Sequence, residues 1–482
     1  MNHRLVANVL GKVMLIEALL MIFPLFVGIY YRENTYLNYL LPMAGLTAAG
    51  TALSLIKIKD RSIYAKEGFV IVALAWIIMS LVGATCFVIG GEIPNYIDAF
   101  FETVSGFTTT GASILNNVET LSKSAMFWRL FTHWIGGMGV LVFVLAVIPA
   151  SGSGAMHIFK AESPGPSSSK LVGKIRNTAQ ILYGIYVIMT LIETILLCAG
   201  GLNLYESLLN SFSTAGTGGF GTHNGSIAYY NSVYVEMVIA VFMFLFGVNF
   251  NVYYLFIIGN FSKAFRNREF LTYFAIVVVS TLIIAINILG MCADFSAALR
   301  YSFFQVTSIS STTGFATADF NTWPALSKGI LLVLTVVGAC GGSTGGGMKV
   351  SRVIVLCKSG AADIKRMINP RAVITVKNEG SALTSETEQN VRSYFILYML
   401  FVVAVTLLVS LDAYSGGDIL SNFSATLACI GNVGPGLNLV GPASSYAGYN
   451  WFSKLSLSFA MLAGRLELFP IIILFTPRTW RK

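Results

Sequence analysis

Long apolar segments alternate with short polar runs along this chain. Several apolar segments are uncharged and approach or exceed the roughly 20 residues that a helix needs to cross a bilayer. The first two, at about 14–30 and 36–56, predict an antiparallel helical pair joined by residues 31–35. Residues 1–30 lack a small-residue cleavage site, so the first helix is expected to be retained.

After a basic loop at 57–66, one pattern occurs four times: an outer helix, an amphipathic half-helix, a polar loop containing glycine, and an inner helix. Such a long repeat indicates one structural unit used several times. The expected outer helices lie at about 68–90, 179–200, 271–289 and 393–411, and the half-helices at 97–106, 204–215, 295–308 and 419–429. The inner helices are expected at about 127–149, 234–258, from 326 onward, and 451–475.

The repeats predict an all-α polytopic membrane protein. Two leading transmembrane helices would be followed by four pseudo-repeats of helix, pore loop and helix around one central pore. The predicted division is 1–60 for the N-terminal hairpin, 61–152, 153–262 and 263–390 for the first three repeats, and 391–482 for the fourth. The third repeat would also hold an intramembrane gating loop, 338–348, and a basic cytoplasmic segment.

The polar loops are the candidate functional sites. A non-helical backbone at membrane depth is tolerated where it lines a water-filled cavity or is buried in protein. Glycine allows positive φ, so carbonyl groups can point the same way and replace the hydration shell of an ion. The half-helices would direct their negative carboxyl ends at the membrane centre, which favours a cation. The expected filter residues are Thr109, Thr110 and Gly111; Thr217, Gly218 and Gly219; Thr312, Thr313 and Gly314; and Asn432, Val433 and Gly434.

Alternatives apply to these loops and to the acidic residues around them. Glycine, threonine and serine also favour ordinary turns, although four loops at matched positions argue against four unrelated turns. The acidic residues are expected to concentrate cations at the mouth of a pore, or each is a capping or solvated carboxylate. They are Glu92, Asp98, Glu102, Glu206, Asp294, Asp319 and Asp418.

The third inner span contains six glycines in the ten residues 338–347. Because glycine costs roughly 1 kcal/mol relative to alanine inside a helix, this stretch should form a loop that lines the cavity and acts as a gate. The expected gate residues are Gly341, Gly342, Ser343, Thr344, Gly345, Gly346, Gly347, Lys349 and Arg465. A nucleotide-binding loop is disfavoured, because Lys349 follows Met348 and no Ser or Thr follows it.

Arg465 lies within the last span, where a charge is expensive and usually functional. Glu467 is only two residues away, so the two would not face each other on a regular helix. Arg465 is therefore expected to bind carbonyls of the gate loop, or to be a structural charge bonded to neighbouring helix ends. Asn249 and Asn251 either line the cavity or form polar contacts between helices, and His133 is expected to pack rather than bind a ligand.

The charge distribution predicts the orientation. With the N-terminus inside, 24 of the 31 Lys and Arg residues fall on inner loops and ends, six fall outside, and Arg465 lies within a span. This asymmetry follows the positive-inside rule, so both termini are expected to be cytoplasmic. The net charge of +9 does not indicate nucleic-acid binding, because no basic patch is interleaved with aromatic residues. The six scattered cysteines are expected to be buried thiols.

Six segments, taken in order, resemble a superfamily of potassium transporters that includes the TrkH, KtrB and plant HKT proteins. They are FTTTGAS (107–113), FSTAGTGGFGTH (212–223), TTGFATADFNTWP (312–324), GGSTGGGMKVSR (341–352), CIGNVGPGL (429–437) and AGRLELFP (463–470). The resemblance covers essentially the whole chain, and the extra N-terminal helix pair is similar to the TrkH branch.

The resemblance implies potassium uptake through a selective, gated, channel-like pore in a prokaryotic plasma membrane. The glycine in each loop implies K⁺ permeation, with K⁺ as the transported ion and no organic cofactor. It also implies a homodimer that docks on a cytosolic nucleotide-binding ring similar to TrkA, for which residues 358–392 and the basic C-terminus are candidate surfaces. The alternatives are a Na⁺- or H⁺-coupled symporter, and a membrane enzyme or receptor subunit. The enzyme is disfavoured because no catalytic constellation is found.

Overall fold

The computed structural model describes residues 1–58, 64–139, 175–371, 375–378, 381–413 and 418–480. An N-terminal hairpin is formed by α1 (His3–Leu20), α2 (Ile22–Tyr30) and α3 (Tyr36–Ser54). Gly11 of α1 and Gly50 of α3 face each other so closely that a Cβ atom on either would lie less than 3.0 Å from the carbonyl oxygen of the other. Small residues thus allow the two helices to pack backbone to backbone, as is common in membrane proteins.

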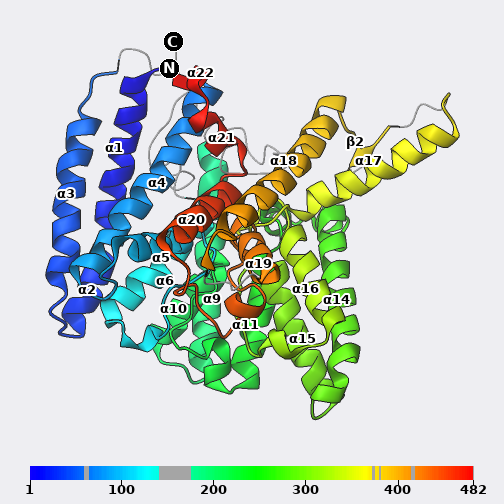
Figure 1. Ribbon diagram of the computed structural model, residues 1–482, viewed down its shortest axis with the longest axis horizontal. Coiled ribbons are helices and arrows are strands. Elements are labelled where there is room, and N and C mark those ends of the chain that lie inside the picture. Colours follow the sequence, from blue (N-terminus) through cyan, green and yellow to red (C-terminus); the bar gives the residue numbers. More distant parts are fainter. Residues whose placement is uncertain (59–63, 140–174, 372–374, 379–380, 414–417, 481–482) are drawn as a thin grey trace.

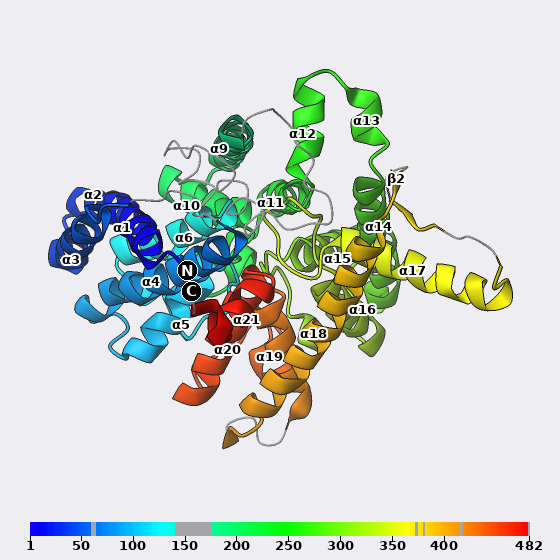
Figure 2. The ribbon, with the colours of Figure 1, turned by 90° about the horizontal axis from the view of Figure 1, so that it is seen from above.

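Four repeats follow the hairpin and surround a common centre, as seen in Figure 2. The first repeat has α4 (Ala65–Ile89), α5 (Tyr96–Phe107) and α6 (Lys123–Gly137). The second has α9 (Ile175–Ala199), α10 (Leu204–Gly216), α11 (Val233–Phe246), α12 (Phe250–Ile257) and α13 (Phe261–Phe265). The third has α14 (Arg268–Ile288), α15 (Phe295–Ser310), α16 (Ala325–Val337) and α17 (Val350–Ile368). The fourth consists of α18 (Ser385–Val409), α19 (Ile419–Ile430), α20 (Trp451–Arg465), α21 (Phe469–Phe475) and α22 (Pro477–Trp480). Two short strands, β1 (Lys377–Asn378) and β2 (Ser381–Ala382), pair between α17 and α18.

The half-helices α5, α10, α15 and α19 begin where a polar side chain caps the first turn. Asn95, Asn203, Asp294 and Asp418 each accept a backbone N–H from that turn, with distances of 2.7–3.1 Å. Such caps are the residues that favour helix starts. The same device therefore sets the start of all four half-helices, and the predicted half-helices are found within about two residues of their expected ends.

Both chain ends lie on one side of the molecule, which we call the terminal side (Figure 1). The rings of His3 in α1 and Trp480 in α22 stack there with centroids 6.3 Å apart. The long helix α17 projects away from the body on the same side (Figure 1). The half-helices enter the protein from the opposite side.

The inner helices are less regular than expected. The predicted helix at 234–258 is wrong, because α11 and α12 are separated at 247–249 and bend by 91°. The predicted helix at 451–475 is also wrong, because α20 ends at Arg465 and left-handed residues Glu467 (φ 59°) and Leu468 (φ 62°) precede α21. The third inner helix is interrupted after Val337, as its glycines predicted. For the first, α6 ends at Gly137, and the expected continuation at 140–149 lies outside the described residues.

Among the described residues, five helices are long and apolar enough to cross a membrane, or six if the bent α11–α12 pair counts as one span. The breaks divide inner spans into pieces shorter than a full crossing. Within the described residues, three such breaks therefore leave irregular backbone in the second, third and fourth inner spans.

Candidate ion pathway

Four loops, one after each half-helix, meet in a closed ring. We call residues 109–111, 217–219, 312–314 and 432–434 the ring loops. A Cβ atom on Gly111 would lie less than 3.0 Å from the carbonyl oxygen of Gly218 in the next loop. The same close approach joins Gly219 to Thr313, Gly314 to Val433, and Gly434 back to Thr110. The ring thus runs once around in chain order, and no side chain fits at any of the four glycines.

Each half-helix ends in the same backbone motif. The residues Thr109, Thr217, Thr312 and Asn432 are left-handed, with φ of 54°, 54°, 63° and 53°. In each loop the residue after this left-handed one donates its N–H to the carbonyl five positions before it, at 2.8–2.9 Å. This is the Schellman termination, in which glycine is usual at the left-handed position. Three β-branched threonines are held there instead, at a cost of about 1–3 kcal/mol each, so the surrounding fold imposes this conformation.

The second left-handed position in each loop is a glycine. The φ angles of Gly111, Gly219, Gly314 and Gly434 are 83°, 78°, 88° and 93°. Two positive φ angles separated by one residue set the direction of the carbonyls in every loop. The structure therefore brings all twelve predicted filter residues together with nearly the same backbone geometry in each repeat.

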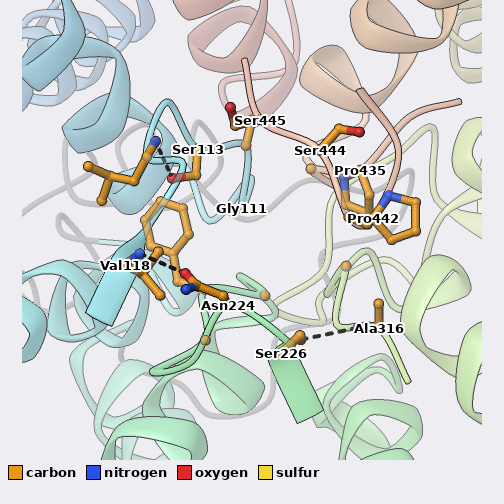
Figure 3. Close-up of a pocket in the computed structure, with 18 of the residues that line it drawn as sticks. Gly111, Ser113, Val118, Asn224, Ser226, Ala316, Pro435, Pro442, Ser444 and Ser445 are labelled. Carbon is orange, nitrogen blue, oxygen red and sulfur yellow. Dashed lines mark hydrogen bonds between the residues drawn. The ribbon is translucent and has the colours of Figure 1, made fainter. Parts of the chain in front are cut away.

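The four ring glycines also line an open cavity of about 210 Å³ on the side opposite the termini. Figure 3 shows Ser113 of the first repeat on one side of this cavity and Pro435 and Pro442 of the fourth on the other. The other walls come from the loops that follow α10 and α15. The cavity therefore extends from that side to the ring glycines.

The seven acidic residues that were expected to concentrate cations do not line this cavity within the described part of the chain. Asp98 pairs with Lys454 at 2.6 Å, Glu102 pairs with Arg129, and Asp294 and Asp418 cap half-helices. Hydrogen bonds from Ser421 and Asn438 lower the pKa of Asp418 below its usual value. The contacts therefore support the capping alternative for Asp294 and Asp418, whereas Asp98 and Glu102 form ion pairs that neither alternative included.

A buried ion pair braces the first two ring loops from behind. Arg129 Nε lies 2.7 Å from Glu102 Oε1, and both side chains are almost fully buried. The guanidinium also donates to the Gly221 carbonyl at 3.2 Å and lies 3.5 Å from the centre of the Phe220 ring. Glu102 in turn accepts the Ile114 N–H at 2.9 Å. The sequence did not single out Arg129, because its partners lie 27 and 92 positions away.

His133 is one helical turn beyond Arg129 on α6 and joins the same two repeats. Its Nδ1 lies 2.7 Å from the carbonyl of Gly106, and its Nε2 lies 3.3 Å from the N–H of Phe220. Only a neutral ring that carries its proton on Nδ1 satisfies both contacts. The expectation that His133 packs agrees with this geometry, and the ring has an additional role as a hydrogen-bonded spacer.

The third and fourth ring loops are braced by hydroxyl groups. Ser308 donates to the carbonyl of Phe315 at 2.6 Å, and Tyr446 donates to that of Gly434 at 2.8 Å. Ser424 accepts the N–H of Leu437 at 2.9 Å. In contrast to the first two loops, none of these contacts involves a charged group.

The glycine-rich segment 338–349, which we call the central loop, lies directly on the terminal side of the ring. The N–H of Gly346 donates to Thr312 Oγ1 at 2.6 Å. A Cβ atom on Gly345 or Gly346 would lie less than 3.0 Å from the carbonyl oxygens of Ser311 and Gly431, respectively. The central loop therefore packs against the ring from the terminal side, at the carboxyl ends of α15 and α19.

Arg465 binds both kinds of group that the sequence suggested. Its guanidinium donates to the carbonyl of Thr344 in the central loop at 2.8 Å. It also donates to the carbonyls of Gly136 and Gly137, at 2.5 and 2.7 Å, where α6 ends. Glu467, two residues further on, forms a two-pronged ion pair with Arg352. Arg465 thus connects the fourth repeat to the first repeat and to the central loop.

The remaining predicted polar residues lie close to the same loop. Lys349 is buried and its ammonium donates to the carbonyl of Gly345, so it stabilises the turn of the loop from within. Asn249 caps α12 by accepting the N–H of Asn251 at 2.9 Å, and its amide lies 3.4 Å from Glu269. Glu269 was not predicted, because nothing in its local sequence distinguishes it from a surface acid at the start of a helix.

Half-helices that point their carboxyl ends at a ring of backbone carbonyls define a class of helical membrane transport proteins for cations. The chain belongs to the TrkH family: the family model, described as "Cation transport protein", matches residues 42–482. Membership confirms the resemblance noted in the sequence, and it agrees with the expectation that the chain is not an enzyme.

Relatives and a solved structure match over the full length. The chain is 34% identical to "Trk system potassium uptake protein TrkH" of Escherichia coli K12, with 100% of both chains covered. It is 32% identical to "Trk system potassium uptake protein TrkG" of the same organism, with 99% of both covered. The crystal structure of the potassium transporter TrkH from Vibrio parahaemolyticus has a TM-score of 0.88 at 32% identity, with 100% of both chains covered.

Proposed function

We propose that this chain takes up K⁺ across the plasma membrane of a prokaryote through a selective, gated pore. The observation that carries the proposal is the closed ring of glycine and carbonyl contacts among the four ring loops. Relatives covering the full length are named as potassium uptake proteins. Backbone carbonyls can replace the water around a potassium ion, and the dipoles of the half-helices favour a cation at the same place.

The ring loops are the proposed selectivity filter. Each glycine contacts the carbonyl of the next loop, so the opening cannot widen or narrow in one loop without moving another. The middle residues of the loops are Thr110, Gly218, Thr313 and Val433, which differ in side chain but share their backbone bonds. The filter would therefore bind ions through its backbone atoms, while the side chains around it differ from one loop to the next.

The central loop is the proposed gate. It contacts the ring through Gly345 and Gly346 and is held by Arg465 through the carbonyl of Thr344. An ion leaving the ring toward the terminal side would meet the loop and the positive charge of Arg465. Opening would require the loop to leave these contacts.

The distribution of Lys and Arg supports an orientation with the terminal side in the cytoplasm. We place the regulatory partner, a cytosolic nucleotide-binding ring similar to TrkA, on this side. The projecting helix α17 and the basic segment that follows it offer a surface for that ring and for a second copy of this chain (Figure 1). No nucleic-acid partner is proposed.

Tracer uptake into liposomes tests the function. Full-length protein alone would be reconstituted, and rubidium uptake measured with and without imposed Na⁺ and H⁺ gradients. Uptake that K⁺ inhibits and that ignores both gradients supports the pore. Uptake that requires one of the gradients would instead establish the coupled symporter. The wild-type protein without its partner could be closed and show no uptake. Variants that release the proposed gate are then the positive controls, because they should take up rubidium without a partner.

A further inference from the structure

The central loop is held at two places by side chains from different repeats. Arg465 binds its middle at Thr344 from the fourth repeat. The base of the loop is bound by Glu269, the second residue of α14, which is 8% exposed. The roles proposed above leave this carboxylate unassigned.

One carboxylate oxygen of Glu269 spans the two ends of the loop. Oε1 accepts the N–H of Gly341 at 2.6 Å, near the start of the loop. The same oxygen accepts the N–H of Ser351 at 3.2 Å, in the first turn of α17 just after the loop. A single group therefore joins the two ends of the eleven-residue segment from Gly341 to Ser351.

The second oxygen connects this closure to the neighbouring repeat. Oε2 lies 3.4 Å from the side-chain nitrogen of Asn249, which caps α12 at the break of the second inner helix. The backbone at that break also bonds to the loop, since Phe250 N–H donates to the Gly342 carbonyl at 3.0 Å and Cys340 N–H to the Gly247 carbonyl at 3.0 Å. Glu269 thus lies where the loop, α17 and the α11–α12 break meet.

We propose that Glu269 is a latch, a positioning residue that holds the central loop in its closed form. This inference rests on the proposed gate. A carboxylate that accepts backbone N–H groups makes strong, charge-assisted hydrogen bonds, and its negative charge is favourable at the amino end of α17. Without it, the N–H groups of Gly341 and Ser351 lose their common acceptor, and the base of the loop is free to separate from α14.

The position of Glu269 also explains how a movement on the terminal side could open the loop. Only Arg266, Asn267 and Arg268 separate α13 from Glu269. A displacement of the α12–α13 segment would therefore shift the carboxylate directly. Figure 2 shows α12 and α13 extending from the body, with α13 leading into α14.

Glu67 provides a matched control. It is also a buried acid in the first turn of an outer helix, α4, and it accepts a backbone N–H, that of Asn2, at 3.2 Å. Its contact belongs to the N-terminal hairpin. Loss of Glu67 therefore removes the same charge and the same kind of bond without touching the central loop.

The test compares the full-length wild type with Glu269→Ala, Glu269→Gln and Glu67→Ala in liposomes without any partner. We expect both Glu269 variants to raise basal rubidium uptake by about tenfold, the effect of losing one charge-assisted hydrogen bond. The K⁺ over Na⁺ preference should remain as in wild type, because the ring is not touched. Glu67→Ala should not raise basal uptake.

Amide hydrogen exchange gives a second readout that does not depend on transport. In Glu269→Gln, the amides of residues 341–351 should exchange faster than in wild type, while those of the half-helices should not. Unchanged exchange together with unchanged basal uptake would overturn the latch. Increased uptake with loss of ion preference would overturn it too, because it would indicate collapse of the ring.

Arg465→Ala separates failure of the latch from failure of the proposed function. If this variant conducts and Glu269→Ala behaves as wild type, the pore and its gate stand and the latch is wrong. If neither variant nor wild type takes up rubidium in any gradient, the proposed function itself fails, while the exchange experiment still reports on the latch.

Discussion

The ring loops and the central loop all contain glycine and contact one another, yet the ring loops follow half-helices and the central loop interrupts an inner helix, and they are anchored in different ways. Each ring loop bonds through its own backbone to the half-helix before it, and its glycine abuts the backbone of the next loop. The central loop is held by backbone bonds to the α11–α12 break and also by charged side chains from other repeats, among them Glu269 and Arg465. Glycine content alone therefore does not indicate mobility. In the proposed function, the ring loops stay in place, and loss of the contacts from Glu269 and Arg465 releases the central loop.

The largest effect is expected from a side chain in the ring. Gly111→Ser should reduce the K⁺ over Na⁺ permeability ratio at least about tenfold, since a difference of about 1.4 kcal/mol in ion binding is sufficient. The new Cβ would collide with the Gly218 carbonyl and would also require φ of 83° at a serine. Reversal-potential measurements on reconstituted protein would report the ratio.

Gly201→Ser provides the control for this substitution. Gly201 has φ of 95°, but no atom lies within 4 Å of its Cβ position among the described residues. This variant keeps the backbone strain without the collision. If both substitutions lowered the ratio equally, crowding in the ring would not be the cause.

A smaller effect is expected from the central loop. Arg465→Ala should raise basal ion flux roughly tenfold or more, because hydrogen bonds from a charged group contribute about 1.5–3 kcal/mol each and three carbonyls lose their donor. Arg465→Lys should be intermediate, since an ammonium lacks the planar fork of the guanidinium. Flux through partner-free liposomes measures both. If Arg465→Ala has the same basal flux as wild type, the Arg465 side chain does not hold the central loop.

The two halves of the ring can be compared with each other. His133→Phe should lower thermal stability and weaken ion preference a few-fold. It removes the hydrogen-bond acceptor of the buried Phe220 N–H, at about 1–3 kcal/mol, and leaves the Gly106 carbonyl with only the Thr109 N–H. Ser424→Ala, in the half braced by hydroxyls, should have a milder effect on both. Melting curves in detergent and permeability ratios would distinguish them. Equal effects would remove the distinction between the halves.

The smallest effect is expected at the outer start of a half-helix. Asp418→Ala should cost about 1 kcal/mol of stability, as for other lost helix caps, without altering ion preference. Because the folded-state pKa of Asp418 is lowered, its stabilising contribution is present above the unfolded value of about 3.9 and is lost as the pH falls through the folded pKa. Melting temperatures of wild type and variant should therefore differ at pH 7 and converge in strong acid.

Much of the fold could be predicted because its signals are local. The outer helices have continuous apolar runs, and the half-helices begin at Asn or Asp and end at loops that contain glycine, with threonine in three of the four. The repetition of this order four times indicated a single centre. The glycines at 338–347 indicated a break in the third inner helix, which the structure shows.

The other breaks depend on contacts between repeats and have weak local signals. Leu466, Glu467 and Leu468 contain neither glycine nor proline, yet two of them adopt left-handed angles, with Glu467 paired to Arg352. Gly247 is a lone glycine in an apolar run, and the bend beside it is stabilised by bonds to the central loop. Glu269, Arg129 and Glu102 were missed as bracing groups for the same reason, since each acts on a segment distant in sequence.

The order of contacts in the ring has a consequence for biogenesis. Gly434, from the final repeat, packs against Thr110 of the first, and Arg465 follows only 31 residues later. A ribosome that has inserted three repeats has therefore produced three quarters of a circle with no enclosed passage. The residue that secures the central loop emerges soon after the circle can close, so with the proposed pore and gate a partly synthesised chain would not leak ions into the cell that is making it.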